Sequence, residues 1–358
     1  MEAKQALNEI AQLVDVEVEK ILSDETKLSK DISPIIKEIL TTFPVVSFGG
    51  KRLRAAFVYF SYIMHNGRNK NEVLKVGAAI ELLHSYLLAH DDMMDRSDMR
   101  HSKPTVNKYY EALAKMQGYR RPEAVHFGDS MAVNAGDVLC HIGLDIITNA
   151  KFEAHKKLKA LSKINCEFKD TGYGQVIDVY GSILKEVDED YVMQVHYFKI
   201  GKYTYETPLH VGAILAGANQ AQLDALTKYS IPGGIAFQIQ DDILGMFGNE
   251  KKIGKRADSD LREGKKTLLI VKAMEKGTPA QKKKIAECLG NQEINYDDLE
   301  EVRKIIIDTG SLEYSKETAR KLVLKAKRAI KDIEDLNWSP RGKAFLDAIA
   351  DYMITREY

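Results

Sequence analysis

An all-α fold is predicted by the sequence from three observations. Apolar residues recur at the spacing of an amphipathic helix near both ends of the chain. Only 8 of the 358 residues are proline, and none lies within 123–207, so long stretches can be helical. Alternating β-branched runs closed by Asn-Gly turns, which would indicate strands, are scarce. With no repeat or shift in composition, we predict a single domain, 1–358, of roughly ten or more helices.

The composition excludes several classes of protein. A hydrophobic content of 44% suffices for a packed core and argues against general disorder. The 52 Lys and Arg residues balance the 52 Asp and Glu residues, so the molecule lacks the basic surplus of a nucleic-acid binder. The three cysteines fit neither a disulfide framework nor a zinc motif, which favours a reducing compartment.

A cytoplasmic location is expected from the start of the chain and from its apolar runs. The N-terminus is charged and amphipathic, unlike an export signal. No uncharged apolar run has the length that spans a membrane, and the best stretch, 207–223, contains Pro208, His210, Asn219 and Gln220. We therefore expect no transmembrane segment.

In chain order, an amphipathic helix comes first and a basic turn follows it. The stripe of the helix consists of Leu7, Ile10, Leu13, Val14 and Ile21. The turn Gly49-Gly50 then enters a helix with three cations in four residues, Lys51, Arg52 and Arg54. Loop amides at a helix start, together with Lys and Arg, suit phosphate oxygens, although such a cluster is more often merely exposed.

The apolar run 78–89 predicts a buried helix, and an acidic cluster closes it. On a helix, Asp91 and Asp95 lie about 40° apart and Asp92 precedes Asp95 by three residues, so the carboxylates converge. Each like-charged pair costs a few tenths of a kcal/mol, roughly, and a hard divalent cation with oxygen ligands is the natural compensation. His84 lies two turns before Asp91 on the same face.

A second acidic pair, Asp241-Asp242, follows the apolar stretch 231–239, with Gln238 one turn earlier. One such pair is usually a solvated helix face, but two clusters, each closing an apolar helix, are hard to attribute to chance. The glycine-containing charged stretches 96–128 and 245–267 are predicted loops beside these clusters, where lids and phosphate contacts tend to lie.

Cations beside both clusters indicate a polyanionic ligand, most simply a diphosphate. The apolar helices that precede the two clusters imply that the rest of the ligand is apolar. Because no nucleophile triad or P-loop is evident, metal-assisted departure of diphosphate from an apolar carbon fits best. These cations are Arg100 after the first cluster, Lys199 in an aromatic segment, and Lys255, Arg256, Lys265 and Lys266 after the second cluster.

Taken together, these motifs resemble those of the trans-isoprenyl diphosphate synthases, from about Phe48 to Thr267. Each motif alone is weak, but so many in the same order are highly specific. The resemblance implies a helical bundle around a central apolar cavity, the isoprenoid synthase type of fold, and a homodimer. The matching pieces are Gly-Gly-Lys-Arg-Leu-Arg at 49–54, Glu81-Leu-Leu-His84, the acidic motif at 91–95, Arg100 with Lys103-Pro104-Thr105, Gly136-Asp137, Lys199 with Pro208-Leu209, Gln238 with Asp241-Asp242, and Gly254-Lys255 through Asp260 to Gly264-Lys265.

The resemblance also implies an activity and a role for each motif. The enzyme would condense isopentenyl diphosphate with an allylic diphosphate (dimethylallyl, geranyl or farnesyl) by ionisation, condensation and elimination, with no dedicated side-chain base. Several Mg²⁺ ions would be held by Asp91, Asp92, Asp95, Asp241 and Asp242. The allylic diphosphate would contact Arg100, Lys199, Gln238, Lys255 and Lys265. Isopentenyl diphosphate would contact Lys51, Arg54 and His84.

Four residues depart from the family's pattern. His101 stands where the family usually has a second Arg, and Ser102 follows instead of Gly. Since His titrates near neutrality, we expect isopentenyl diphosphate to bind less tightly as pH rises. Ile200 replaces the Thr that commonly follows Lys199 and removes a hydroxyl that could help to stabilise a cation. Gly245 replaces the third Asp of the second motif, as is common in bacterial-type members.

Product length is predicted from the residues before the first acidic motif. Tyr86, Leu87 and Leu88 would form the floor of the prenyl pocket. Tyr86 stands five positions before Asp91, and an aromatic residue at this position resembles the pattern of geranylgeranyl (C20) synthases. Farnesyl (C15) or longer-chain synthases are the alternatives. A bulky ring would stop chain growth by steric exclusion. Alternatively, Tyr86 packs a helix interface, since it lies about 140° from Asp91 on the helical wheel.

Three other classes of protein stay open at this point. Two Glu-x-x-His pairs, at 81–84 and 123–126, have the spacing of ferritin-like di-iron proteins. His101 and Ile200 are compatible with a non-catalytic subunit of a heteromeric prenyl synthase, although such a subunit needs no Asp ligands. A class I terpene cyclase also has an Asp-rich motif, but it would lack the contacts for isopentenyl diphosphate.

Overall fold

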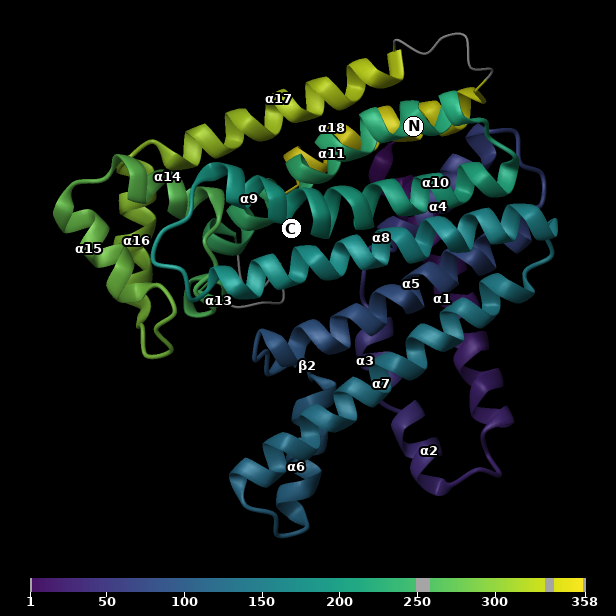
Figure 1. The fold of residues 1–358 in the computed structure, drawn as a ribbon, viewed down its shortest axis with the longest axis horizontal. Helices are drawn as coiled ribbons and strands as arrows, with labels where there is room; N and C mark the ends of the chain where they lie inside the picture. Colours follow the sequence, from purple (N-terminus) through teal and green to yellow (C-terminus); the bar gives the residue numbers. More distant parts are fainter. Residues whose placement is uncertain (1, 249–257, 332–337, 357–358) are drawn as a thin grey trace. The chain divides into compact units, whose positions relative to one another are not determined.

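The computed structural model describes residues 2–248, 258–331 and 338–356 (Figure 1). The predicted all-α class is confirmed: within these residues the sheet structure consists of one two-stranded antiparallel ladder, β1 (Met99–Arg100) and β2 (Lys103–Pro104). The helices pack as two compact units. We call residues 2–162 with 211–217 the N-terminal unit, and residues 163–210 with 218–358 the C-terminal unit. The single-domain organisation stays a prediction.

The N-terminal unit is built around α4 and α5. Every residue of α4 except Arg54 is buried, and α5 packs against α1, α3, α4 and α7. In α1, Leu7, Ile10 and Val14 are buried as predicted, whereas Leu13 is half exposed. The helices are α1 (Ala3–Leu28), α2 (Pro34–Leu40), α3 (Phe43–Ser47), α4 (Leu53–Met64), α5 (Lys70–Met94), α6 (Val106–Met116) and α7 (Arg121–Asn149).

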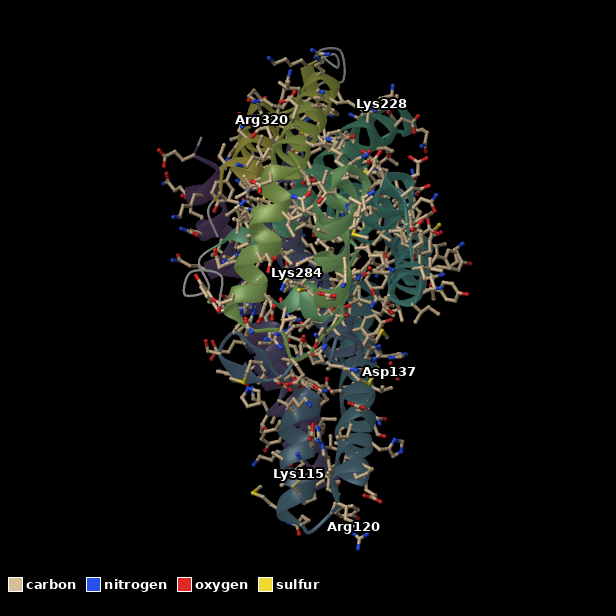
Figure 2. All side chains as sticks on the ribbon, turned by 90° about the vertical axis from the view of Figure 1, so that its left-hand side faces the viewer. Lys115, Arg120, Asp137, Lys228, Lys284 and Arg320 are labelled. Carbon is tan, nitrogen blue, oxygen red and sulfur yellow. The ribbon has the colours of Figure 1, made fainter. Side chains whose placement is uncertain are left out.

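The predicted loop 96–128 is wrong for most of its length. It contains β1, β2, α6 and the first turns of α7, and Lys115 and Arg120 mark the two sides of the α6–α7 turn in Figure 2. Pro122 lies at the second position of α7, where its missing N–H breaks no helical hydrogen bond. Gly128 lies inside α7, where an added Cβ would meet the carbonyl oxygen of Asn107 at 2.3 Å. This glycine therefore permits close helix packing and does not mark a loop.

The C-terminal unit is centred on α11, which packs against η1 and α17. Asn219 and Gln222 form a capping box at the start of α11. The helical spacing of apolar residues noted near the C-terminal end of the chain is confirmed in α17, where Val323, Ala326 and Ile330 are buried. Helices α8 and α10 run through both units. The helices are α8 (Ala154–Gly181), α9 (Glu189–His196), the π-helix η1 (Tyr197–Glu206), α10 (Thr207–Ala216), α11 (Gln220–Phe247), α13 (Ser259–Arg262), α14 (Leu268–Lys276), α15 (Pro279–Cys288), α16 (Tyr296–Asp308), α17 (Ser311–Lys331) and α18 (Pro340–Thr355).

The predicted loop 245–267 is partly helical. Gly245 lies inside α11, and α13 begins at Ser259. Residues 249–257, which include Lys255 and Arg256, lie outside the described residues.

Helix α7 has the length and composition of a possible membrane span, with a mean hydropathy of 1.2 over its most apolar window. It nevertheless carries Asp137 and Asp145, and it packs against α5 and α6 within the N-terminal unit. Such packing is typical of a core helix in a globular protein. The predicted lack of a transmembrane segment and the cytoplasmic location stay predictions.

Candidate active site

The first acidic cluster lies at the C-terminal end of α5. Asp91 and Asp92 belong to the last turn and Asp95 is the C-cap, with no basic residue in that turn. Carboxylates at this end of a helix oppose the macrodipole, so a cation must compensate them. Arg100 does so for Asp92: its Nε donates to Oδ2 at 2.8 Å and its Nη2 to Oδ1 at 2.6 Å. Burial raises the pKa of Asp92 despite this pairing, and Asp91 and Asp95 raise it further.

Arg100 reaches Asp92 because a tight hairpin follows α5. Arg100 pairs with Lys103 across the β1–β2 ladder, which leaves His101 and Ser102 as a two-residue turn. Both have positive φ, 48° and 62°, as a type I′ turn requires. The Gly expected by the family's pattern at position 102 would adopt this conformation without a Cβ penalty, so Ser102 makes the turn more strained.

The glycine turn and the hairpin meet in the N-terminal unit. Gly49 has φ of 96°, and an added Cβ would lie 2.9 Å from Cγ of His101, so the turn packs directly on the imidazole ring. Three residues after Gly49, Arg52 is the buried N-cap of α4 and has a left-handed backbone conformation. Its Nε donates to Oδ1 of Asp15 at 2.7 Å, and its guanidinium lies over the ring of Phe48. Asp15 therefore holds this turn, although no motif in the sequence points to it.

The cations of this unit act on one another. Burial lowers the pKa of His84 well below its usual value, and the charges of Arg54, Arg100 and Arg52 lower it further. Burial also lowers the pKa of His101, again with Arg100 and Arg52 contributing. The charges of Arg52 and Arg100 therefore act on both imidazoles and favour their neutral form.

The Glu-x-x-His pairs do not behave as metal ligands of a di-iron protein. Glu81 accepts the Ala55 N–H at Oε1, at 2.9 Å, and its Oε2 lies 3.9 Å from Arg52. This carboxylate thus fixes the start of α4. Glu123 and His126 are exposed on α7.

Tyr86 lies at the interface of α5 and α7. Its ring packs edge-on against His90 at 5.0 Å, and burial raises its pKa, with Cys140 and Asp137 of α7 adding to the shift. These contacts agree with the packing alternative, while its role in product length stays a prediction. Leu87 and Leu88, the next two residues in the chain, are partly buried.

The second acidic region lies in the last two turns of α11, slightly before the helix end that was predicted. Asp242 is buried, and its Oδ1 accepts Nε2 of Gln238 at 2.8 Å. Nε2 of His196 lies 3.3 Å from the other oxygen, Oδ2, which has no hydrogen bond. Asp241 is more exposed and is paired with Arg356, whose guanidinium also lies over the ring of Phe237 at 4.2 Å.

The other predicted contacts of the C-terminal unit also have acidic partners. Nζ of Lys199, on η1, lies 2.7 Å from Oδ2 of Asp178 on α8. Nζ of Lys265 lies 2.6 Å from Oε2 of Glu263. An added Cβ at Gly245 would lie 2.6 Å from Oδ2 of Asp260, so the Asp260 carboxylate occupies the space of a side chain at that position.

The predicted site residues thus divide between the two units. Four further residues contact a predicted site residue or its neighbour without belonging to any sequence motif: Asp15, Asp178, His196 and Arg356. The N-terminal unit contains Lys51, Arg54, His84, Tyr86, Leu87, Asp91, Asp92, Asp95, Arg100 and His101. The C-terminal unit contains Lys199, Ile200, Gln238, Asp241, Asp242 and Lys265, and Lys255 lies outside the described residues.

The donor set fits hard divalent cations. All the candidate ligands are carboxylate oxygens, the ligands that Mg²⁺ and Ca²⁺ prefer. Oδ2 of Asp242 is a buried acceptor without a hydrogen bond, which a bound ion would satisfy. Asp91 and Asp95 are only partly buried at their helix end. Both oxygens of Asp92 are already engaged by Arg100, so Asp92 is the least available of the five.

Comparison with known proteins agrees with this chemistry. The sequence profile of the polyprenyl synthetase family matches residues 34–306. The chain is 32% identical to the geranylgeranyl diphosphate synthase of Methanosarcina mazei over 315 residues, 88% of each chain. It is 34% identical to the short chain isoprenyl diphosphate synthase of Methanocaldococcus jannaschii over 270 residues, 75% of each chain.

A solved structure extends the likeness to the fold. The geranylgeranyl pyrophosphate synthase of Corynebacterium glutamicum, complexed with isoprenyl diphosphate and magnesium, has a TM-score of 0.88 and 27% identity, covering 98% of this chain and 99% of that one. The fold, the acidic clusters with their cations and the family profile all agree: the chain belongs to the polyprenyl synthetase family and is a prenyltransferase.

Proposed function

We propose that the chain condenses isopentenyl diphosphate with an allylic diphosphate to give geranylgeranyl diphosphate. One observation carries this proposal: cations gather beside an acidic helix end in the N-terminal unit. Burial lowers the pKa of His84 and of His101, and the charges of nearby arginines lower both further. Clustered arginines suit a polyanion, and the adjacent carboxylates suit a metal diphosphate complex.

In the proposed reaction, the allylic C–O bond breaks and its electron pair leaves with the diphosphate. The double bond of isopentenyl diphosphate then attacks the allylic carbon and a C–C bond forms. The resulting cation gives up a proton to the departed diphosphate, and the electron pair of the broken C–H bond forms the new double bond. Lys199, Gln238 and Lys265 would contact the allylic diphosphate. Lys51, Arg54 and His84 would bind the second substrate. The Asp92 carboxylate would hold Arg100 at a fixed angle toward the departing diphosphate, as its bidentate geometry allows.

Metal ions serve diphosphate binding in this family. We propose Mg²⁺, several ions per site, because the donors are carboxylates and because the Corynebacterium glutamicum relative is complexed with magnesium. Asp91 and Asp95 at one cluster, and Asp241 and Asp242 at the other, would hold these ions. When bound, Mg²⁺ would neutralise charge on the departing diphosphate.

A C20 product is favoured by the relatives and by Tyr86. The Methanosarcina mazei relative is named a geranylgeranyl diphosphate synthase, and a 31% identical relative from Aeropyrum pernix is named a geranylfarnesyl diphosphate synthase. Product length therefore varies within the matched group, and C15 or longer products are the alternatives. If Tyr86 forms the pocket floor, Tyr86→Ala gives longer products; an unaltered product range would leave it a packing residue.

A homodimer is supported by an apolar stripe on α8. Tyr173, Val176 and Tyr180 lie on one face of this helix and are 55%, 67% and 59% exposed. Aromatic and apolar side chains so exposed are typical of an oligomer interface. Light scattering after gel filtration would report a dimer mass, and Val176→Asp would give a monomer.

The deciding experiment offers isopentenyl diphosphate with dimethylallyl, geranyl or farnesyl diphosphate, with and without Mg²⁺, and resolves the products by chain length. We expect C20 product from each primer only when Mg²⁺ is present. Absence of condensation with every primer would overturn the proposal. A matched control is Asp224→Asn, an exposed carboxylate at the other end of α11, which should leave turnover unchanged.

A further inference from the structure

The π-helix η1 requires a physical cause. Among the described residues it is the only π-helical segment, and it extends over ten residues, Tyr197–Glu206. π-helices are rare, and most are single-turn bulges within α-helices. At the end of η1, the N–H and the hydroxyl of Thr207 both donate to the Lys202 carbonyl, five residues earlier. Surrounding contacts must therefore hold this register against the α-helical alternative.

The N-terminal half of η1 is fixed by close backbone packing on α8 and α11. An added Cβ at Gly174 of α8 would lie 2.7 Å from Cβ of Phe198 and 3.1 Å from Cγ of Lys199. An added Cβ at Gly234 of α11 would lie 2.7 Å from Cα of Gly201. These two glycines let η1 lie directly between the helices at the position of Lys199.

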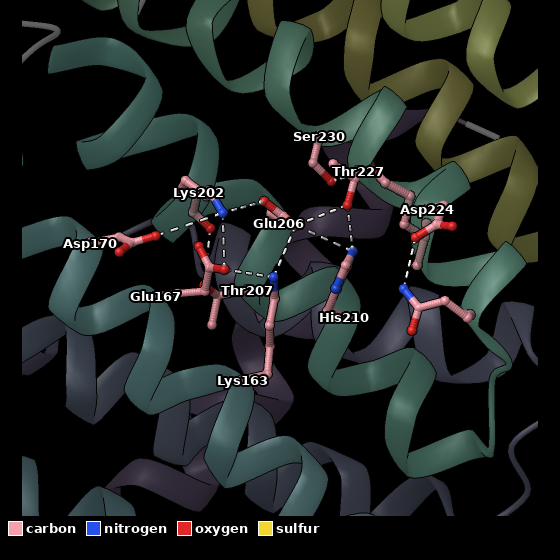
Figure 3. A network of polar contacts seen from close by, with 12 residues as sticks. Lys163, Glu167, Asp170, Lys202, Glu206, Thr207, His210, Asp224, Thr227 and Ser230 are labelled. Atoms are coloured by element: carbon pink, nitrogen blue, oxygen red, sulfur yellow. Dashed lines mark hydrogen bonds and ion pairs between the residues drawn. The ribbon is translucent and has the colours of Figure 1, made fainter. Parts of the chain in front are cut away.

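The C-terminal half of η1 is tied to the same two helices by charges (Figure 3). Nζ of Lys202 lies 3.2 Å from Oε1 of Glu167 on α8. Oε1 of Glu206 accepts Nζ of Lys163 on α8 at 2.9 Å and the hydroxyl of Thr227 on α11 at 2.9 Å. Glu167 and Glu206 are both buried. A buried ion network is weak evidence for stability, but it can fix a structural register.

His210 closes the network on the side of α10 and carries no charge there. Its Nε2 lies 3.1 Å from the Thr227 hydroxyl. Burial lowers the pKa of His210 to about 4, with Lys163 contributing. Burial alone would raise the pKa of Glu206, but the charges of Lys163 and Lys202 outweigh it and lower that pKa. Glu206 is thus an anion held between Lys163 and Lys202.

We propose that Lys202 and Glu206 are positioning residues: they tie the end of η1 to α8 and α11 and so maintain the π-helical register that directs Lys199 toward Asp178. If the tie is removed, η1 can relax to an α-helix, and a one-residue change of register turns the preceding side chains by about 100°. Lys199 would then leave Asp178. That this matters for the allylic diphosphate rests on the proposed function.

The test uses the full chain and the variant Lys202→Met/Glu206→Gln, which removes one charge of each sign. The first measurement is the rate at which an amine-reactive reagent labels Lys199, followed by mass spectrometry. Lys272, paired with Glu189 at 2.8 Å in the same unit, serves as internal reference. The second measurement is KM for the allylic diphosphate, compared with KM for isopentenyl diphosphate. The control Lys304→Met/Asp308→Asn removes an exposed pair on α16.

We expect faster labelling of Lys199 but not of Lys272, and a rise of about tenfold in the allylic KM alone, the weight of one charge-assisted contact. The single variant Lys202→Arg, which keeps both charges of the pair, should have the labelling rate and the allylic KM of the wild type. If the double variant fails to fold, Thr227→Val tests the α11 tie in milder form, with a smaller change in the same direction. Unchanged labelling and KM, with only a lower Tm, would overturn the inference. A wild-type chain without prenyl transfer refutes the proposed function, whereas the labelling result still tests the positioning.

Discussion

The two acidic regions of this chain obtain their positive partners in different ways. At the end of α5, Asp92 is held by Arg100, which lies only eight residues further on in the first strand of the hairpin. In α11, Asp241 is held by Arg356, 115 residues further on. The first region can form as soon as α5 and its hairpin form, because the contact is local. The second needs the whole C-terminal unit to fold before its charge is balanced.

The two regions also differ in how deeply their aspartates are buried. Asp92 is 2% exposed and both of its oxygens are bound, while the side chain of Asp241 is 39% exposed. A fully engaged carboxylate orients its partner, whereas an accessible one can exchange its partner for a ligand cation. The first region therefore combines an orienting residue, Asp92, with the more accessible Asp91 and Asp95. The second offers Asp241 behind a replaceable guanidinium.

The largest expected effect comes from removing one accessible carboxylate in each region. Asp91→Asn and Asp241→Asn should each lower kcat/KM by on the order of 10²–10³, the range for loss of one group that stabilises transition-state charge. Steady-state kinetics at saturating Mg²⁺ measures this. Asp98→Asn, an exposed carboxylate in the hairpin, is the matched control. A loss of less than about tenfold in only one of the two variants would remove that region from the reaction.

Removing the arginine partner is expected to cost more unfolding free energy in the first region than in the second. Arg100→Met leaves the buried Asp92 carboxylate unpaired and should cost about 3 kcal/mol of unfolding free energy. Arg356→Met removes the partner of a half-exposed carboxylate and should cost about 1 kcal/mol, part of it from lost contact with Phe237. Urea unfolding followed by circular dichroism gives both values. Equal costs would mean that the two ion pairs are equally buried in solution, contrary to the difference described above.

A smaller effect concerns the affinity of the second region for a divalent cation. Because Arg356 occupies Asp241, an incoming ion must displace it, and Arg356→Gln should tighten Mn²⁺ binding by about tenfold, or 1.4 kcal/mol. Titration of the substrate-free protein with Mn²⁺, followed by electron paramagnetic resonance, measures this without any turnover. Arg320→Gln, an exposed arginine on α17, is the control. Weaker Mn²⁺ binding in Arg356→Gln would instead make the guanidinium a support for the metal site.

What the sequence could predict follows the same division between local and distant contacts. The all-α class, the acidic motifs and Arg100 were accessible because helical spacing and neighbouring charges are local signals. The hairpin turn was not recognised, because His101-Ser102 lacks the Asn-Gly signature of a type I′ turn. Helix α6 and the start of α7 were missed because the charged, glycine-containing stretch 96–128 indicated a loop, although Gly128 lies in α7 and permits close packing on α6. Asp178 and Arg356 contact their partners only through tertiary folding, which one sequence does not encode in a visible spacing.

The smallest expected effect is the pH dependence of isopentenyl diphosphate binding in the first region. Burial, Arg100 and Arg52 lower the pKa of His101 below 6.5, so the imidazole is charged only in acid. Its contact with a diphosphate is present below that lowered pKa and is lost as pH rises through it. As pH is raised from acid toward 6.5, KM for isopentenyl diphosphate should therefore increase by at most about tenfold. Above pH 6.5 it should stay constant. His101→Arg should have a lower KM that lacks this rise, since an arginine keeps its charge. If both proteins show the same profile, the titration belongs to the substrate and His101 contributes no charge to this site.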